Sequence, residues 1–388
     1  MVHSTSGEVN DHRVVLVKCD DYDHTSQAMA RGVDLLGGAA NFCLSGEGLL
    51  LKPNLLVGDA PERGSTTHPA VFEAAAELFS NVGGRLFYGD SPGFGTPQLA
   101  VRSSGMERIA KLFDIRLADF NVMIEMPNPD GLLMKQFQVA KGLTQVDGVI
   151  NLPKLKTHAL TRLTGAVKNL FGCLPGVQKS AFHARLANER HFADMLVDLA
   201  EMIKPRLHIM DGVVGMEGNG PRNGSMRKVG VILLSTNPHA LDYCVARIMN
   251  LDPNLVPTLE SARQNGLLDP ARIDILGDPL EGFVIEDFDV NRSKMSTTGT
   301  QRFYMPLLNH WVTPKPVIEE TKCTQCGRCV KICPVTPKAL SFPDGRRQSP
   351  QYNYDRCIRC YCCQEMCPDE AICIKTHPIG RLLNQLKL

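Results

Sequence analysis

Short apolar runs alternate with amphipathic stretches from residue 14 to about residue 288. The apolar runs are rich in Val, Ile and Leu and are bounded by Gly, Pro, Asn or Asp, which is typical of buried strands. They predict strands at 14–18, 48–54, 146–152, 206–212 and 228–235, and one from Arg85 into a glycine-rich loop that ends at Gly95. Helical patterns between them cover 26–36, 68–84, 164–172 and 190–203, with Thr67 as the candidate cap of the second.

Strands that alternate with helices of about 10–15 residues indicate βαβ units and a parallel sheet. We therefore expect an α/β domain over residues 13–290, with a mainly parallel sheet and flanking helices. Residues 291–316 lack a clear period and predict a connector packed through Phe303, Tyr304 and Trp311. A small α+β domain over 317–376 and a short C-terminal tail over 377–388 complete the expected order.

The cysteines are distributed unevenly, with ten of the 14 between Cys323 and Cys373. Two runs have the spacing C-x2-C-x2-C-x3-C followed by Pro, and the second repeats the first after 34 residues. This pattern is typical of a ferredoxin with two [4Fe–4S] clusters, in which the fourth cysteine of each run binds the other cluster. The expected ligands are Cys323, Cys326, Cys329 and Cys367 for one cluster, and Cys357, Cys360, Cys363 and Cys333 for the other.

Zinc is the alternative, but four-cysteine zinc sites usually combine two separated C-x2-C pairs. Cys362 and Cys373 stand among the expected ligands and are either exchanged ligands or small buried residues, the second being more usual.

The overall composition, 43% hydrophobic and 21% charged, indicates a globular protein. A formal net charge of +1 argues against general nucleic-acid binding. No apolar run reaches the roughly 20 residues of a membrane span, and the first residues show no secretory signal. We therefore expect a cytoplasmic protein, where reducing conditions favour metal binding by clustered cysteines over disulfides.

One basic stretch breaks this charge balance. Residues 148–188 contain six Lys and Arg residues and neither Asp nor Glu. The stretch follows a predicted strand, where α/β folds place ligand loops, so an anion site is expected, with a solvated positive face as the alternative. The candidate anion-binding residues are Lys154, Lys156, His158 and Lys168.

Polar residues also stand near the ends of other predicted strands, in 52–54, 89–95 and 211–221. Strand ends can converge on one crevice, which makes Asp90, Asp211 and Glu217 candidates for handling protons. Turn chemistry alone also explains Gly, Pro, Asn and Asp at such places. Neither a phosphate-binding loop nor a dinucleotide fingerprint is present.

Several segments together resemble the domain-of-unknown-function 362 family: LKPNLL, THPAVFEAAAEL, GDSPG, NLPKLKTHALTRLTGAVKNLFGCLPG, MDGVVGMEGNGP and NPHALDYCVARIMNLDP. The resemblance covers residues 13–290. It implies an α/β domain, and several members carry a C-terminal two-cluster ferredoxin domain. It implies no substrate.

Two functions follow from these features. The first is a ferredoxin-domain-fused oxidoreductase that acts, in either direction, on an anionic small molecule held by the α/β domain. The second is a non-catalytic relay that docks a partner oxidoreductase and passes electrons to it. A sensor whose clusters report oxygen or iron is a third, less favoured reading. The sequence leaves the oligomeric state open.

Overall fold

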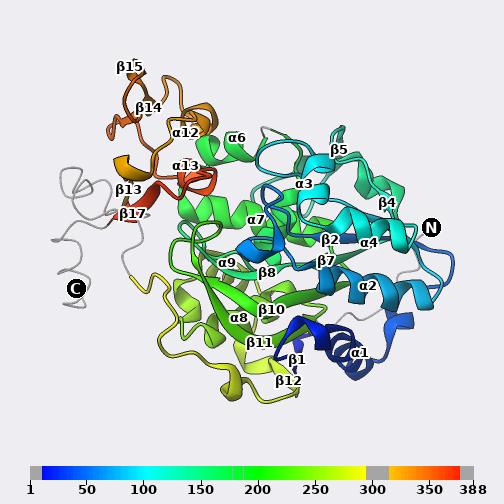
Figure 1. Cartoon of the computed structure of the whole chain (residues 1–388). Helices are drawn as coiled ribbons and strands as arrows, with labels where there is room; N and C mark the ends of the chain where they lie inside the picture. Colours follow the sequence, from blue (N-terminus) through cyan, green and yellow to red (C-terminus); the bar gives the residue numbers. More distant parts are fainter. Residues whose placement is uncertain (1–10, 177, 187, 294–313, 376–388) are drawn as a thin grey trace.

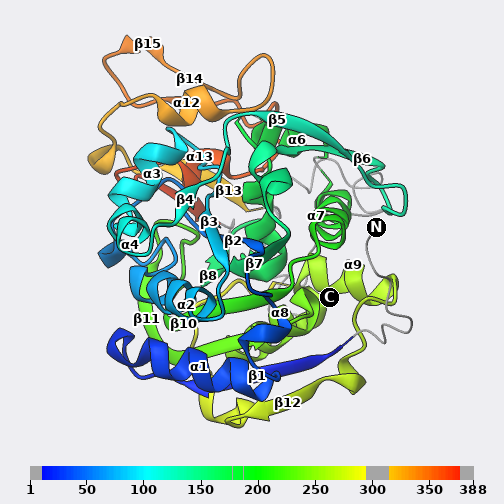
Figure 2. The same cartoon turned by 90° about the vertical axis from the view of Figure 1, so that its right-hand side faces the viewer.

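The computed structural model describes residues 11–176, 178–186, 188–293 and 314–375. Within these residues one large sheet has helices on both faces, and a small cysteine-rich domain lies beyond one end of it (Figures 1 and 2). Most of the expected connector, with Phe303, Tyr304 and Trp311, and the expected tail fall outside the described residues. In the part of the chain that is described, no helix has the length and apolar character needed to cross a membrane.

The main sheet has the order β12–β1–β11–β10–β7–β2–β3–β4, and β8 and β9 extend from β10. Its strands are β1 (Arg13–Lys18), β2 (Gly48–Pro53), β3 (Arg85–Tyr88), β4 (Arg116–Leu117), β7 (Gly148–Leu152), β8 (Lys154–His158), β9 (Arg162–Leu163), β10 (Leu207–Glu217), β11 (Ser225–Ser235) and β12 (Asp274–Gly277). Strands β10, β7, β2, β3 and β4 pair in parallel, and β11 is antiparallel to both of its neighbours. The expected α/β class with a mainly parallel sheet is confirmed.

Helices cover both faces because the strands bury both of their faces. In β1, Val15 and Val17 pack under one set of helices while Val14 and Leu16 pack under the other. The first set is α1 (Thr25–Leu35), α2 (Pro69–Asn81), α3 (Pro97–Ser103) and α4 (Met106–Leu112). Opposite them lie α8 (Pro238–Ile248) and α9 (Pro257–Gln264), and a further core joins α5 (Gly165–Asn169), α6 (Gln178–Arg185) and α7 (Glu189–Ile203) to the hairpin β5–β6 (Met123–Pro127, Gln136–Ala140).

The expected loop after β7 is instead a strand. Residues 154–158 form β8, which pairs in parallel with β10, and β10 continues through Glu217 rather than ending at residue 212. The glycines of 211–218 suggested a turn, but Gly212 serves close packing, since a Cβ there would lie 2.7 Å from the carbonyl oxygen of Val231. The long partner β11 supplies the hydrogen bonds that keep this segment extended.

The cap of α2 is His68 rather than the expected Thr67. The Nδ1 atom of His68 accepts a hydrogen bond from the backbone N–H of Ala70. The Thr67 hydroxyl donates to the carbonyl oxygen of Leu152 over 2.6 Å and accepts from the N–H of Asn54. Tertiary contacts therefore occupy the side chain that the local pattern favoured as a cap.

The small domain has two similar halves. Its elements are β13 (Lys315–Ile318), α12 (Arg328–Ile332), β14 (Leu340–Ser341), β15 (Pro343–Arg346), β16 (Gln351–Tyr352), α13 (Cys362–Glu365) and β17 (Ile372–Lys375). Strand β13 pairs with β17, so the first and last segments of the domain lie side by side. The expected small α+β domain is confirmed as a fold.

The short helix α5 is anchored by a buried carboxylate on α8. Asp242 is fully buried and accepts hydrogen bonds from the backbone N–H groups of Ala166 and Val167, at 2.5 and 3.1 Å. Gly165 precedes them with a φ of +61°, and a Cβ there would lie 2.3 Å from the Asp242 carboxylate. Burial raises the pKa of Asp242 to about 7 despite these two bonds.

Asp242 should therefore lower stability as the pH rises, because the folded protein favours the protonated form. Between pH about 5.5 and 7 the free energy of unfolding should lose on the order of 2 kcal/mol relative to Asp242→Asn, which lacks this titration. The measurement is the Tm of both proteins under anaerobic conditions at several pH values.

Asp278→Asn is the matched control for this experiment. Its hydrogen bonds to Arg31 hold the pKa of Asp278 below the usual range, so that carboxylate stabilises the fold once ionised, and its contribution weakens toward acid pH. A Tm difference between wild type and Asp242→Asn that stays constant with pH would contradict the assignment.

Candidate functional site

Four cysteines of the small domain line one narrow apolar cavity. They are Cys323, Cys326, Cys329 and Cys367, and the other lining residues include Ile318, Ala371 and Ile372. Burial raises the pKa of Cys329 to about 12, and the neighbouring thiols of Cys326, Cys367 and Cys323 add to the effect. Four thiols that line one cavity are the donor set that a [4Fe–4S] cluster requires, and the irons would hold them as thiolates.

The backbone repeats the same unusual conformations in both cysteine runs. Gln325 and Gly327 have φ values of +58° and +77°, and the residues 34 positions later, Arg359 and Tyr361, have +58° and +61°. Left-handed residues between the cysteines turn each loop so that successive thiols face inward. In the second run, burial raises the pKa of Cys363, and the nearby thiols of Cys360 and Cys357 raise it further. The Tyr352 hydroxyl lies 3.2 Å from the Cys363 sulfur.

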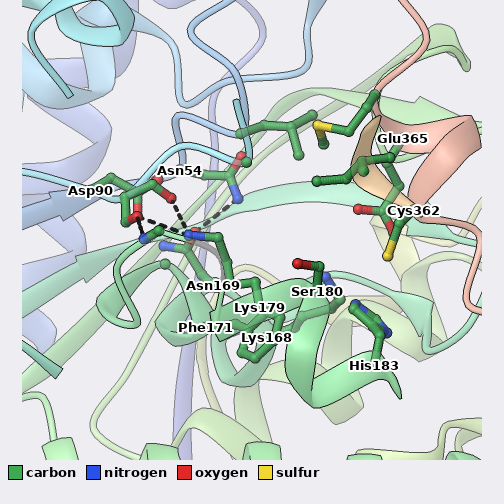
Figure 3. A pocket seen from close by; sticks show the side chains of 17 residues that line it. Asn54, Asp90, Lys168, Asn169, Phe171, Lys179, Ser180, His183, Cys362 and Glu365 are labelled. Atoms are coloured by element: carbon green, nitrogen blue, oxygen red, sulfur yellow. Dashed lines mark hydrogen bonds between the residues drawn. The ribbon is translucent and has the colours of Figure 1, made fainter. Parts of the chain in front are cut away.

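A separate pocket lies between the α/β domain and the small domain (Figure 3). Its cavity volume is about 100 Å³, which is room for a few water molecules or one small ligand. The α/β domain contributes strand-end loops and helices, and the small domain contributes α12 and α13. The lining residues include Asn54, Leu56, Asp90, Ser91, Lys168, Asn169, Phe171, Lys179, Ser180, His183, Ile332, Cys362, Glu365 and Met366.

Polar contacts hold α13 against the α/β domain. The buried side-chain amide of Gln364 donates to the carbonyl oxygens of Asn219 and Gly220, and Asn223 donates to the carbonyl oxygens of Gln364 and Cys367. Arg63 and Glu370 add an ion pair of 2.8 Å nearer the surface. These contacts fix the wall of the pocket that the small domain provides.

The two lysines of the pocket differ in what their ammonium groups contact. Lys179 donates three hydrogen bonds, to the carbonyl oxygens of Ser91 and Leu174 and to the Ser91 hydroxyl, so its charge is used within the protein. Lys168 makes no hydrogen bond to any residue that the structure describes, and its ammonium lies 5.7 Å from the centre of the Phe171 ring. Burial lowers the pKa of Lys168, whereas Glu365 favours its charged form. Lys168 is thus the cation available to a ligand.

Glu365 enters this region from α13 and meets His158. The Nε2 atom of His158 lies 3.0 Å from a carboxylate oxygen of Glu365, without the alignment of a full hydrogen bond. The Nδ1 atom of His158 accepts from the N–H groups of Leu160 and Thr161, which places its proton on Nε2, toward Glu365. Burial, together with the charge of Lys168, lowers the pKa of His158 to about 4, so the ring is neutral at pH 7.

The candidate Asp90 lines the pocket but is held by other groups. One of its oxygens accepts from the ammonium of Lys52 at 2.8 Å, and the other accepts from the N–H of Leu55. Gly172 packs against this pair, since a Cβ there would lie 1.8 Å from the Asp90 carboxylate.

The remaining candidates in the α/β domain lie behind or away from the pocket. Lys154 and Asp211 form a buried ion pair of 2.8 Å that also contacts the hydroxyl of Tyr22. Lys156 donates to Asn54 and to the carbonyl oxygen of Ser65, and burial lowers its pKa to about 7. Glu217 accepts from the N–H of Asp289 in a different part of the sheet. Since Lys154 and Lys156 are each 1% exposed, the alternative of a solvated positive face is wrong for them.

A chain of amide side chains behind the pocket was absent from the sequence prediction. Lys156 donates to Asn54, Asn54 to Asn169, Asn169 to Asn151, and Asn151 to Nδ1 of His208, at 2.7–2.9 Å. Because the ammonium can only donate, it fixes the direction of every later bond. Asn54 stands among the polar residues at the predicted strand end 52–54, and His183 stands in the basic stretch. No signal in the sequence linked either of them to Glu365 or Cys362.

The chain is similar to known proteins in both of its parts. A family model described as a domain of unknown function, DUF362, matches residues 49–247, and a 4Fe-4S dicluster domain matches residues 315–368. A thylakoid-associated protein of Synechocystis is 40% identical over 233 residues, which is 60% of this chain and 72% of that protein.

The C-terminal part has its own relatives. An uncharacterized ferredoxin of Methanocaldococcus jannaschii is 34% identical over 59 residues, 15% of this chain and 75% of the ferredoxin. The pyruvate synthase subunit PorD of Thermotoga maritima is 32% identical over 74 residues, 19% of this chain and 69% of that subunit. Iron–sulfur electron transfer is therefore the role that this domain supports.

Among solved structures, the lactate racemase apoprotein of Thermoanaerobacterium thermosaccharolyticum is similar with a TM-score of 0.39 and 11% identity. The match covers 59% of this chain and 56% of that one. The resemblance read from the sequence motifs is confirmed by the matching regions: the chain belongs to the family of the domain of unknown function DUF362 and carries a C-terminal 4Fe-4S dicluster domain.

Proposed function

We propose that the chain is an oxidoreductase that binds an anionic small molecule in the pocket between its two domains. The observation that carries this proposal is that one pocket is lined both by Lys168 and by Cys362, which stands between the expected ligands Cys360 and Cys363. A molecule bound to Lys168 would therefore lie next to the second cysteine run.

The proposal includes two [4Fe–4S] clusters with the interlocked ligand sets expected from the sequence. The cavity lined by Cys323, Cys326, Cys329 and Cys367 supports the first set, since its fourth member comes from the second run. We assign the second set to Cys357, Cys360, Cys363 and Cys333. We also propose that the α/β domain ends at residue 290 and the small domain begins at residue 317. We propose a cytoplasmic location as well, where thiols stay reduced.

When bound, the clusters would supply or accept single electrons. The residues of the chain bind and orient the ligand. Lys168 would attract its negative charge, and the centre of the Phe171 ring lies 5.7 Å from that ammonium. Lys179 holds the loop around Ser91 in place, and Glu365 limits the site to weakly charged anions by placing a carboxylate on the opposite domain.

A relay without catalysis is the second candidate, and the exposure of Cys326 favours it. This cysteine is solvent-exposed, whereas Cys329 and Cys367 in the same cavity are buried. Electron transfer to a partner protein is efficient where a cluster approaches the surface, so this side of the domain suits a redox partner. The two candidates differ in whether Lys168 matters for electron exchange.

Lys168→Met should separate the two functions. Loss of the free ammonium should slow the anaerobic re-oxidation of reduced protein by a metabolite extract by about tenfold or more, since charge-assisted contacts are lost. Absorbance in the visible range follows the reaction. Lys111→Met, on an exposed position of α4, is the matched control and should behave as wild type. Equal rates for wild type and both variants would favour the relay.

Cys326→Ala tests the ligand assignment. Loss of this thiol should remove the cluster shared with Cys367, leaving about four of about eight irons per chain and the EPR signal of one reduced cluster. Cys373→Ala, in strand β17, should keep both clusters. Two intact clusters in the Cys326 variant would contradict the pairing.

A further inference from the structure

His183 is a buried histidine whose ring nitrogens have no partner within the described residues. Its side chain is held by aromatic rings: it stacks on Phe192 at 4.3 Å between centroids and meets Phe171 edge-on at 5.9 Å. The residue is 5% exposed and makes no hydrogen bond to any residue that the structure describes. It lines the interface pocket opposite Cys362 and Glu365 (Figure 3).

The imidazole is buried as a whole, but its ring nitrogens are not sealed from solvent. A ligand that displaces water from them must replace the lost hydrogen bonds. The pocket that His183 lines is a space from which a ligand can reach them. Burial lowers the pKa of His183 to about 3, Lys168 and His158 lower it further, and Glu365 opposes them. The ring is therefore neutral at pH 7, with one nitrogen as donor and the other as acceptor.

The charges around the pocket suit a ligand with a single negative charge. Lys168 offers three N–H donors, whereas the ammonium of Lys179 is already used by Ser91 and Leu174. Glu365 presents a carboxylate from the other wall, and a second negative charge on the ligand would be repelled by it. A neutral His183 adds a hydrogen bond but no further positive charge.

Besides its polar residues, the pocket wall carries apolar side chains. Leu56, Ile332 and Met366 line the pocket together with the Phe171 ring. Such a surface favours a short carbon skeleton over an inorganic anion, since burial of CH₂ groups is favourable.

Resting on the proposed function, we propose that the ligand is a small organic monocarboxylate that also carries a hydroxyl or oxo group. Lys168 binds the carboxylate, and His183 forms a hydrogen bond with the neutral oxygen. His183 is thus a specificity residue: a ligand that lacks the second oxygen leaves the buried imidazole without a partner.

The test is binding to oxidised, cluster-loaded protein, measured by calorimetry under anaerobic conditions. Butyrate, 2-hydroxybutyrate and 2-oxobutyrate are the matched probes, and phosphate and malonate are the dianions for comparison. We expect at least one of the two oxygen-bearing acids to bind about tenfold more tightly than butyrate, since the neutral oxygen satisfies a buried donor or acceptor.

His183→Phe preserves the stacking on Phe192 and should erase this preference. His183→Gln keeps a donor and an acceptor and should retain part of the preference. Iron content and Tm of both variants show that the fold and the clusters are intact. A preference that survives in His183→Phe would overturn the role of His183.

Three other outcomes would overturn the ligand class: equal binding of the three acids, tighter binding of phosphate or malonate, or no binding by any probe. The proposed function fails by a different result, namely unchanged electron exchange in Lys168→Met. Equal binding of all three acids together with loss of electron exchange in Lys168→Met would reject the inference and keep the proposed function.

Discussion

The burial of several lysines in a stretch without acidic residues is the constraint on which the centre of the molecule depends. A buried ammonium needs a carboxylate or several carbonyl oxygens, because removing one partner of a buried pair is strongly destabilising. Residues 148–188 supply no carboxylate of their own. The partners come from elsewhere: Asp211 from β10 for Lys154, carbonyl and amide oxygens for Lys156, and Glu365 from the small domain near Lys168.

The carboxylate of Glu365 links the two domains through its charge. Glu365 lies between two expected cluster ligands in the sequence, Cys363 and Cys367, and its carboxylate faces His158 and Lys168 of the α/β domain. Burial raises the pKa of Glu365, but the contact with His158 and the charge of Lys168 outweigh burial and hold that pKa below its usual range. Helix α13, which carries Cys363 of the second cysteine run, therefore also places a carboxylate in the pocket wall. The proposed binding of an anion would therefore depend on the integrity of the small domain through this helix.

A second constraint is the direction of the hydrogen bonds that link the asparagine side chains beside the pocket. Lys156 begins a series of four hydrogen bonds that ends at His208, and each asparagine orientation follows from the one before it. Asn54 and Asn169, the first two members, also line the pocket. The donor and acceptor atoms that a ligand meets there are thus preset by a lysine that does not line the pocket itself, which favours a rigid rather than an adaptable site.

The sequence by itself determined the alternation of strands and helices, the α/β class and the iron–sulfur domain, since these depend on local periodicity and on fixed cysteine spacing. It also identified the basic stretch, including Lys168. Only the tertiary structure decided which of its cations is available, because that depends on partners distant in sequence: Asp211 neutralises Lys154, 57 residues away, and Ser91 engages Lys179, 88 residues away. That His183, Cys362 and Glu365 line one pocket could not be predicted, for the same reason. Their common surface exists only where two domains meet, and a linear pattern carries no signal of that meeting.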